Sequence, residues 1–147
     1  MEIKVLRLPH AKSLDLPAYQ TTLSAGLDLC AAIENPIFME KGQIQLIPTG
    51  FAFHIPVGYE GQVRPRSGLA LQHGITLVNS PGTIDADYRG EIKVPLINLG
   101  QDVYQVTPGQ RIAQLIIAPV IQAKLRETDS LSETNRGTGG FGHTGSF

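Results

Sequence analysis

Short stretches in which apolar residues alternate with polar or small ones recur along the chain. Apolar residues occupy positions 44 and 46, then 51, 53 and 55, and then 92, 94 and 96. A period of two is typical of strands with one buried face. Residues 112–120 are almost continuously apolar, which predicts a strand buried on both faces.

Turn-forming residues separate these stretches at intervals of about 8–12 residues, a rhythm typical of β-sandwiches and barrels. The chain contains 16 glycines and 10 prolines, many of which separate these stretches, whereas a further group of glycines lies in the C-terminal tail. One segment, residues 67–74, predicts a short helix that Ser67 could cap and Gly74 could end. The pattern therefore predicts an all-β domain with a single short helix.

Alternation fades in the last part of the chain, which predicts one domain over residues 1–125 and a flexible arm over 126–147. The arm matches G-x-G-x-x-G at residues 137–142, but only five residues follow, too few for the helix of a dinucleotide fold. Its composition fits a plain flexible tail. Arg136 and Phe141 favour a second interpretation, a loop that closes over a phosphate and a base.

Charge and cysteine content narrow the classes of protein. The net charge of −1 provides no global basic field for nucleic acid, although a small phosphate ligand needs only a few local cations. No apolar run is long enough to cross a bilayer, and charges interrupt the apolar residues of the first seven positions, unlike a secretory signal peptide. The single cysteine, Cys30, is expected to be buried as a small apolar residue, and we expect a cytoplasmic protein.

Residues 64–70, with the sequence Arg-Pro-Arg-Ser-Gly-Leu-Ala, form the first candidate site. Two arginines lead into the start of the predicted helix, where free backbone N–H groups and the helix dipole favour an anion. The simpler interpretation is a helix cap flanked by surface arginines. The segment alone does not decide between them.

Residues 79–91 predict a hairpin whose turn carries Asp85, Asp87 and Tyr88. Two carboxylates in a turn usually form a solvated turn or a weak cation site. A glycosidase pair is an alternative, but nothing else in the sequence indicates sugar binding. The four histidines are far apart in sequence and lack the spacing of zinc ligands.

Five segments in this order resemble the five motifs of the homotrimeric dUTPase family. They are residues 25–29, 64–70, 82–90, 109–115 and 136–145. The resemblance implies a distorted β jelly roll, a homotrimer, and a flexible Gly-rich C-terminal arm that serves as a lid. One subunit would supply the second and fourth motifs to each site, a neighbour the third, and the third subunit the arm. Thr138 and His143 depart from the serine and the small residue usual in the family.

The resemblance also implies a reaction, the hydrolysis of dUTP to dUMP and pyrophosphate. This activity would limit uracil incorporation into DNA and supply dUMP for thymidylate synthesis. Asp85 would hold and deprotonate the attacking water. Mg²⁺ would bind mainly through the substrate phosphates and water, without a direct protein ligand, and Asp28 could contact it through water. The implied phosphate contacts are Arg66, Ser67, Gly68, Gln114 and, from the arm, Arg136.

For the base and sugar, the resemblance implies that the Asn79 amide and the nearby backbone read the uracil edge. Tyr88 would pack under the deoxyribose and exclude a 2′-hydroxyl, whereas Asp87 would be structural. The other implied neighbours are Thr83, Ile84, Lys93 through its backbone, Phe141 stacking on the base, and Gly142.

Two alternatives stay open. A dCTP deaminase shares the fold and the trimer but would not need the Gly-rich lid, so the arm favours a dUTPase. A catalytically silent dUTP-binding protein is the second alternative, and the presence of both Asp85 and the arm argues against it.

Overall fold

The computed structural model describes residues 1–140 of the chain, within which eleven strands, one α-helix and one short 3-10 helix form. The helices are η1 (Pro9–Ala11) and α1 (Ser67–His73). The strands are β1 (Lys4–Arg7), β2 (Leu27–Cys30), β3 (Ile37–Met39), β4 (Ile44–Pro48), β5 (Phe51–His54), β6 (Tyr59–Pro65), β7 (Ile75–Leu77), β8 (Gly82–Ile84), β9 (Lys93–Asn98), β10 (Tyr104–Val106) and β11 (Arg111–Pro119). The predicted mostly β architecture with one short helix is therefore confirmed over the described residues.

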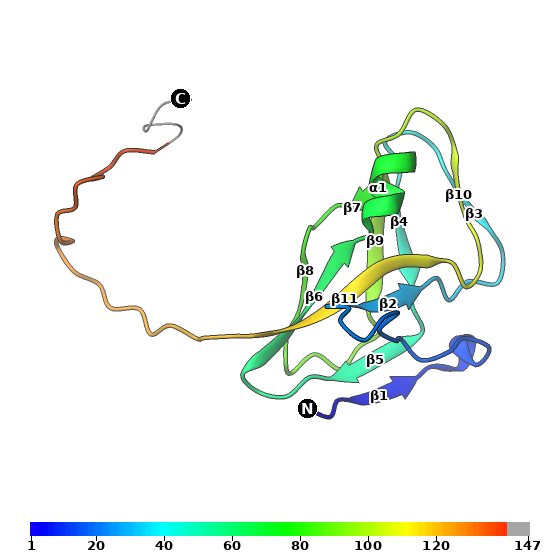
Figure 1. Cartoon of the computed structure of the whole chain (residues 1–147), viewed down its shortest axis with the longest axis horizontal. Helices are drawn as coiled ribbons and strands as arrows, with labels where there is room; N and C mark the ends of the chain where they lie inside the picture. Colours follow the sequence, from blue (N-terminus) through cyan, green and yellow to red (C-terminus); the bar gives the residue numbers. More distant parts are fainter. Residues whose placement is uncertain (141–147) are drawn as a thin grey trace.

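All strand pairings in this part of the chain are antiparallel, and they form four small sheets. The largest sheet has the order β2-β11-β6-β8, and a second has the order β4-β9-β7. Strands β1 and β5 form one pair, and β3 and β10 form another. Figure 1 shows the long strand β11 lying beside β2 and β6. Its residue Gln114 is registered with Asp28 of β2 on one side and with Arg64 of β6 on the other.

The sheets enclose one hydrophobic core. Its largest fully buried side chains include Phe51, Met39, Leu96 and Leu115. Two polar side chains among residues 1–140 are also fully buried. Asn98 donates to the carbonyls of Met39 and Asp102, each at 2.8 Å, and Thr49 donates to the carbonyl of Ile92 at 2.6 Å. Because buried polar groups need partners, these bonds fix how the loops close over the core.

The strands lie close to their predicted positions, but two details of the prediction are wrong. Residues 112–120 are not buried on both faces throughout, since the chain is only half-buried from Ile116 to Ala118 and exposed from Pro119. Residues 79–91 do not form a hairpin, because β8 pairs with β6 whereas β9 pairs with β4 and β7. The segment that carries Asp85 therefore crosses from one sheet to another, a non-local choice that turn residues cannot reveal.

The helix α1 begins at Ser67, so Ser67 is its first residue and not its cap, contrary to the prediction. Arg66 occupies the cap position with an extended backbone, and its side chain does not cap the helix. The end is as predicted, because Gly74 has a left-handed backbone with φ of 68° and its N–H bonds to the carbonyl of Ala70 at 3.0 Å. Only glycine takes this conformation without strain.

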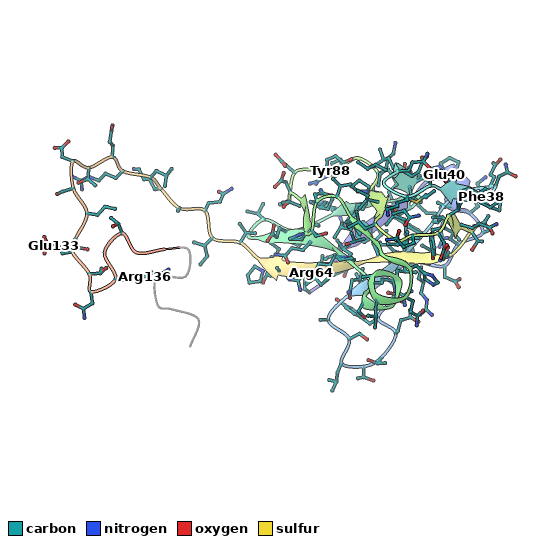
Figure 2. All side chains as sticks on the ribbon, turned by 90° about the horizontal axis from the view of Figure 1, so that it is seen from above. Phe38, Glu40, Arg64, Tyr88, Glu133 and Arg136 are labelled. Carbon is teal, nitrogen blue, oxygen red and sulfur yellow. The ribbon has the colours of Figure 1, made fainter. Side chains whose placement is uncertain are left out.

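After β11 the chain leaves the domain. The N–H of Val120 donates to the carbonyl of Gly58, and residues 121–138 are exposed throughout. Figures 1 and 2 show this segment extending away from the sheets, with the labelled Glu133 and Arg136 remote from Arg64 and Tyr88. Among residues 1–140, we find no helix with the length and apolar character needed to span a membrane.

Candidate functional site

The first candidate region, here called the Arg66 cleft, is a cavity of about 460 Å³ between the start of α1 and the strands β2 and β11. Predicted phosphate contacts meet in it, because β6 ends at Pro65 and leads directly into the first turn of α1. The lining residues are Gln20, Ser24, Ala25, Gly26, Asp28, Arg66, Ser67, Gly68, Leu69, Gln72, Arg111 and Gln114. The fold thus brings Arg66, Ser67, Gly68 and Gln114 together.

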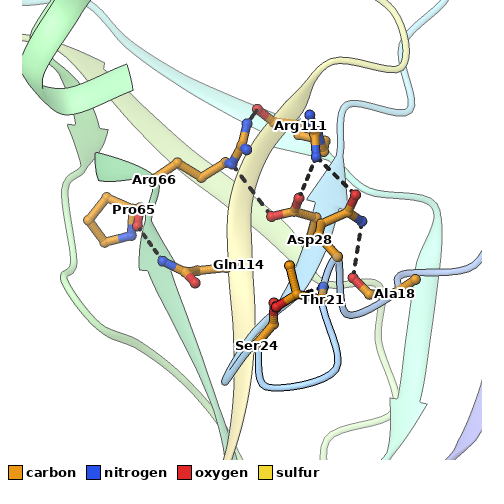
Figure 3. Close-up of polar contacts among 9 residues, drawn as sticks. Ala18, Thr21, Ser24, Asp28, Pro65, Arg66, Arg111 and Gln114 are labelled. Carbon is orange, nitrogen blue, oxygen red and sulfur yellow. Dashed lines mark hydrogen bonds and ion pairs between the residues drawn. The ribbon is translucent and has the colours of Figure 1, made fainter. Parts of the chain in front are cut away.

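Asp28 lies at the centre of an ion-paired network in the Arg66 cleft (Figure 3). One carboxylate oxygen lies 3.5 Å from Nε of Arg66, and the other lies 3.1 Å from Nη1 of Arg111. Arg66 also donates to the carbonyl of Arg111 at 3.2 Å, and Arg111 donates to the side chain of Gln20 at 3.0 Å. The Asp28 side chain is only 13% exposed, so both arginines are tethered to a partly buried carboxylate.

Gln114 is held in the Arg66 cleft by the backbone around it. Its Nε2 donates to the carbonyl of Pro65 at 3.0 Å. Its Oε1 faces Gly26, the residue directly before β2. A Cβ atom at Gly26 would lie 2.7 Å from that oxygen, closer than real contacts allow. Gly26 therefore leaves the space that the Gln114 amide occupies.

The first turn of α1 completes the Arg66 cleft. Ser67 and Gly68 are both exposed, and a Cβ atom at Gly68 would meet no atom within 4 Å. Backbone N–H groups in the first turn of a helix have no partner within the helix. The cleft therefore combines two arginine side chains, a serine hydroxyl and backbone donors, a set suited to phosphate oxygens.

The second candidate region, here called the Tyr88 pocket, is a cavity of about 360 Å³ bounded by β8, β9, β7, β4 and β6. Its lining residues are Leu46, Val63, Leu77, Asn79, Gly82, Thr83, Ile84, Asp85, Tyr88, Glu91, Lys93 and Pro95. All six residues predicted from the segment 79–93 to contact substrate therefore share this pocket, although the predicted hairpin does not form. Apolar side chains form much of the remaining wall, as expected for a site that holds a flat ring.

Glycines and backbone carbonyls shape the Tyr88 pocket. A Cβ atom at Gly82 would lie 3.1 Å from Nδ2 of Asn79, so the Asn79 amide packs directly on this glycine. The Tyr88 hydroxyl donates to the carbonyl of Glu91 at 2.9 Å. The Glu91 side chain, 12% exposed, lies 3.9 Å from the ammonium group of Lys93. In this pocket, a hydrogen bond to the backbone holds Tyr88, and contact with a glycine holds the Asn79 amide.

Asp85 follows β8 directly and is exposed. Its carbonyl accepts the N–H of Tyr88 at 3.1 Å, which closes a turn and leaves the carboxylate at the rim of the Tyr88 pocket. Asp85 also lines a larger cavity of about 620 Å³ on its other side, together with Asp87, Arg89, Glu60 and residues at the root of the C-terminal arm. An exposed carboxylate in this position has room for a water molecule beside it.

The Arg66 cleft and the Tyr88 pocket share no lining residue. In the largest sheet, β11 and β2 lie on one side of β6, and β8 lies on the other. The two regions therefore flank β6 on opposite sides, and a single chain does not bring Arg66 and Asp85 into one cavity. Arg136 joins neither region, because its Nε donates to the carbonyl of Gly139 within the arm. Phe141 and Gly142 lie outside the described residues.

Several residues that shape both regions were not predicted from the sequence. Arg111 and Gly26 lie in two of the five segments that resemble family motifs. Membership of these segments was the only indication in the sequence that they belong to the site. Gln20 and Glu91 carried no signal, because their roles depend on contacts with residues distant in sequence.

Cys30 was predicted to be buried and is only half-buried. It is registered with Arg111 across β2 and β11. Burial raises the pKa of its thiol, and the nearby Asp28 carboxylate raises it further. The protonated thiol is therefore favoured beside the Arg66 cleft.

Comparisons with known proteins agree with this architecture. The model of the dUTPase family matches residues 12–145. The chain is 56% identical over 146 residues to the deoxyuridine 5'-triphosphate nucleotidohydrolase of Sinorhizobium medicae, covering 98% of this chain and 91% of that protein. It is 59% identical over 145 residues to the protein of the same name from Beijerinckia indica, with 97% and 91% covered. The chain belongs to the dUTPase family.

Solved structures show the same relationship. The dUTPase of Staphylococcus bacteriophage 80alpha with dUPNHPP superimposes with a TM-score of 0.88 at 26% identity, with 98% of both chains covered. A mutant dUTPase from phage phi11 of S. aureus, whose structure describes coordination of a structural Mg(II) ion, has a TM-score of 0.79 at 22% identity. The match covers 88% of this chain and 98% of the phage chain. The second likeness supports the shared fold alone.

Proposed function

We propose that this protein hydrolyses dUTP to dUMP and pyrophosphate, with water attacking the α-phosphorus. The observation that carries the proposal is the pair of separate regions described above. One offers two arginines and backbone donors suited to a triphosphate. The other offers an exposed carboxylate, a side-chain amide and a tyrosine suited to a base, a sugar and a water molecule. In the cell, this activity would keep uracil out of DNA and supply dUMP for thymidylate synthesis.

The complete site lies where copies of the chain meet within a homotrimer of distorted jelly rolls, and the arm of the third subunit completes it. One subunit contributes its Arg66 cleft and a neighbour its Tyr88 pocket. The separation of the two regions by β6 supports this assembly, because one chain cannot close both around the same small ligand. The outer face of the β4-β9-β7 sheet also supports it, since Ile44 and Leu46 are 54% and 58% exposed there. Apolar surface of this kind usually belongs to an interface.

In the Arg66 cleft, Arg66, Ser67, Gly68 and Gln114 bind the phosphate oxygens. The guanidinium of Arg66 is oriented by Asp28, so it meets the negative charge without first having to be ordered. Gln114 turns its amide toward the cleft because Pro65 holds the nitrogen. These donors also stabilise the extra charge that develops on the α-phosphate as water attacks.

Asp85 orients the attacking water and accepts its proton. The carboxylate is exposed at the end of a short strand, where water can reach it, and a carboxylate is a weak general base. Such a weak base supplies only part of the acceleration. Positioning of the water and stabilisation of phosphate charge supply the remainder.

Mg²⁺ bound together with the substrate would neutralise charge on its phosphates. Magnesium usually keeps several waters and binds through substrate phosphates with one or two carboxylates. Asp28, in the Arg66 cleft, is the carboxylate that fits this role, through water, because both of its oxygens already pair with arginines. Among residues 1–140 no group of three acidic, histidine or cysteine side chains converges on one point.

In the Tyr88 pocket, Asn79 and the backbone near Thr83, Ile84 and Lys93 read the edge of uracil. A buried donor and acceptor left unpaired by cytosine would disfavour dCTP strongly. The Tyr88 ring packs under the deoxyribose and excludes a 2′-hydroxyl. Asp87, which is exposed and two residues after Asp85, has a structural role in the loop.

The arm, residues 126–147 beyond the domain of residues 1–125, closes over the bound nucleotide as a lid. Arg136 then adds positive charge at the γ-phosphate, Phe141 stacks on the base, and Gly142 allows close approach of the backbone. The extended, exposed course of residues 121–138 supports this role, because such a segment can reach a neighbouring subunit. We place the protein in the cytoplasm and assign it neither a nucleic-acid nor a membrane partner.

The test is release of pyrophosphate from dUTP, dTTP, dCTP and UTP by the purified protein, with and without Mg²⁺. We expect rapid release from dUTP alone, stimulated by Mg²⁺. Release of ammonia from dCTP would instead identify a dCTP deaminase. Tight binding of dUTP without turnover would identify a silent binding protein.

A further inference from the structure

The position of the Tyr88 ring is the starting point. Tyr88 is 43% exposed, so packing in the core does not hold it in place. Its ring nevertheless has a defined position in the wall of the Tyr88 pocket. Two residues that follow it closely in the chain fix this position. These neighbours are Gly90 and Glu91.

Gly90 provides the space in which the end of the Tyr88 ring lies. A Cβ atom added to Gly90 would lie 2.6 Å from Cζ and 3.0 Å from Cε2 of Tyr88, and closer still to the hydroxyl oxygen. Carbon atoms that are not bonded do not approach this closely, so the ring would have to move. The backbone of Gly90 is outside the left-handed region that favours glycine. An alanine at this position would therefore act through its methyl group and not through backbone strain.

Glu91 provides the hydrogen bond that orients the ring. The Tyr88 hydroxyl donates to its carbonyl at 2.9 Å. That carbonyl belongs to a well-anchored residue, since the Glu91 carboxylate accepts the N–H of Gly50 at 2.7 Å and lies 2.8 Å from Nε2 of His10. Through Glu91, the bond therefore ties the exposed ring to Gly50, directly before β5, and to η1.

We propose that Gly90 and the carbonyl of Glu91 are the positioning device for sugar selection, because together they hold the Tyr88 ring where it excludes a 2′-hydroxyl. The inference rests on the proposed function and deepens it. Tyr88 alone would be an exposed aromatic side chain free to rotate away from a ribonucleotide. The absence of a side chain at Gly90 and the hydrogen bond to the Glu91 carbonyl hold the Tyr88 ring in one position.

The test compares kcat/KM for dUTP with kcat/KM for UTP in Gly90→Ala. We expect the ratio to fall roughly tenfold or more, because displacement of a positioning group by about 1 Å can cost up to about 100-fold. The fall should arise from better use of UTP as well as poorer use of dUTP. Gly42→Ala is the matched control, since it adds the same methyl where no atom lies within 4 Å. Any loss of stability from its φ of 77° should leave the ratio unchanged.

A double-mutant cycle separates positioning from a general structural effect. In a Tyr88→Ala background, Gly90→Ala should change the ratio no further, because no ring is left to displace. A ratio that falls equally in both backgrounds, or a folded Gly90→Ala with an unchanged ratio, would overturn the inference. Tyr88→Phe, which removes the hydroxyl but adds no atom, provides a second test if Gly90→Ala does not fold. Its ratio should fall severalfold, and an unchanged ratio would contradict the role of Glu91.

Failure of the proposed function gives a different result. A wild-type protein that turns over no dUTP would refute the proposed activity and, with it, the sugar role. The ring position has its own readout in the NMR signals of ring-labelled tyrosine, assigned by comparison with Tyr88→Phe. Gly90→Ala should shift the Tyr88 signals and leave those of Tyr59 and Tyr104 in place. Unchanged Tyr88 signals would refute the positioning device whatever the activity.

Discussion

The Arg66 cleft and the Tyr88 pocket are organised by different forces. In the cleft, one partly buried carboxylate, Asp28, holds two arginines through ion pairs. In the pocket, glycines make room for side chains and backbone carbonyls orient them. Charge suits a region that must bind a flexible polyanion, since attraction acts over several ångströms. Steric fit suits a region that must reject nucleotides differing by one methyl or hydroxyl group. Steric repulsion is short-ranged, so it is sensitive to a single added atom.

The largest effect should follow from Asp85→Asn, which removes the base and keeps the shape of the pocket rim. We expect kcat for dUTP to fall about 10³-fold, within the range of about 10²–10⁴ that general-base catalysis contributes. Binding of a non-hydrolysable dUTP analogue should change little. Asp87→Asn is the matched control, because Asp87 is also exposed and lies two residues away. A near-normal kcat for Asp85→Asn would remove Asp85 as the base.

Removal of the arm after Asn135 should give the next largest effect. Neither region contains arm residues in the described structure, so the oligomer should form as before. We expect kcat/KM for dUTP to fall about 10²-fold, because the lid contributes a charge-assisted contact and excludes water. The measurement pairs steady-state kinetics with sedimentation equilibrium. An intact oligomer with full activity would show that the arm is only a tail.

Arg66→Ala tests the electrostatic character of the cleft. Loss of a hydrogen bond to a charged group costs about 1.5–3 kcal/mol, so kcat/KM should fall roughly 10- to 100-fold. Arg64→Ala is the control, since Arg64 is exposed two residues earlier and bonds only to Gln62. Equal losses in both variants would indicate a general effect of positive charge and not a specific site.

Asp28→Asn should have a smaller effect than loss of Arg66 itself. The guanidinium of Arg66 would keep its bond to the carbonyl of Arg111 and lose its ionic partner. We expect KM for dUTP to rise severalfold at low ionic strength, with a smaller difference from wild type in about 0.5 M salt, where charges are screened. The preference for dUTP over UTP, set in the Tyr88 pocket, should not depend on salt. A salt-dependent preference would contradict the division between the two regions.

The smallest effect concerns Cys30. Because burial and the Asp28 charge raise the pKa of its thiol, less thiolate is present at pH 8 than in a free cysteine. Alkylation by iodoacetamide should therefore be slower than for glutathione at the same pH. Asp28→Asn removes one of the causes and should speed the reaction. A faster reaction in the wild type than in glutathione would contradict this description of the environment of Cys30.

The sequence was informative at several positions where structure depends on local rules, although the predicted cap at Ser67 was wrong. Gly74 ends the helix as predicted because only glycine takes its backbone conformation easily. The order of motifs also predicted which residues would cluster, since Arg66, Ser67 and Gly68 are adjacent in the chain and lie together in the cleft. What the sequence could not provide was sheet pairing. The choice of β6 over β9 as partner of β8 depends on burial across the whole domain, so residues 79–91 were wrongly interpreted as a hairpin.

Supporting residues were missed for the same physical reason. Glu91 acts on Gly50 and His10, which are 41 and 81 positions away, and no local pattern marks such a contact. Arg111 reaches Asp28 across two neighbouring strands whose register is fixed only in the folded sheet. Family resemblance predicts which residues contact substrate, whereas the structure was needed to find the residues that hold them in place.

The central claim, that one active site draws Arg66 and Asp85 from different copies of the chain, is tested most directly by subunit mixing. Alone, Arg66→Ala should keep at most about a tenth of wild-type activity and Asp85→Asn about a thousandth. When equal amounts are unfolded together and refolded, random assembly should restore about a quarter of wild-type activity, because that fraction of sites receives both intact residues. If both residues acted within the same chain, no mixed assembly would contain an intact site. Activity no higher than the sum of the two variants alone would contradict the shared site.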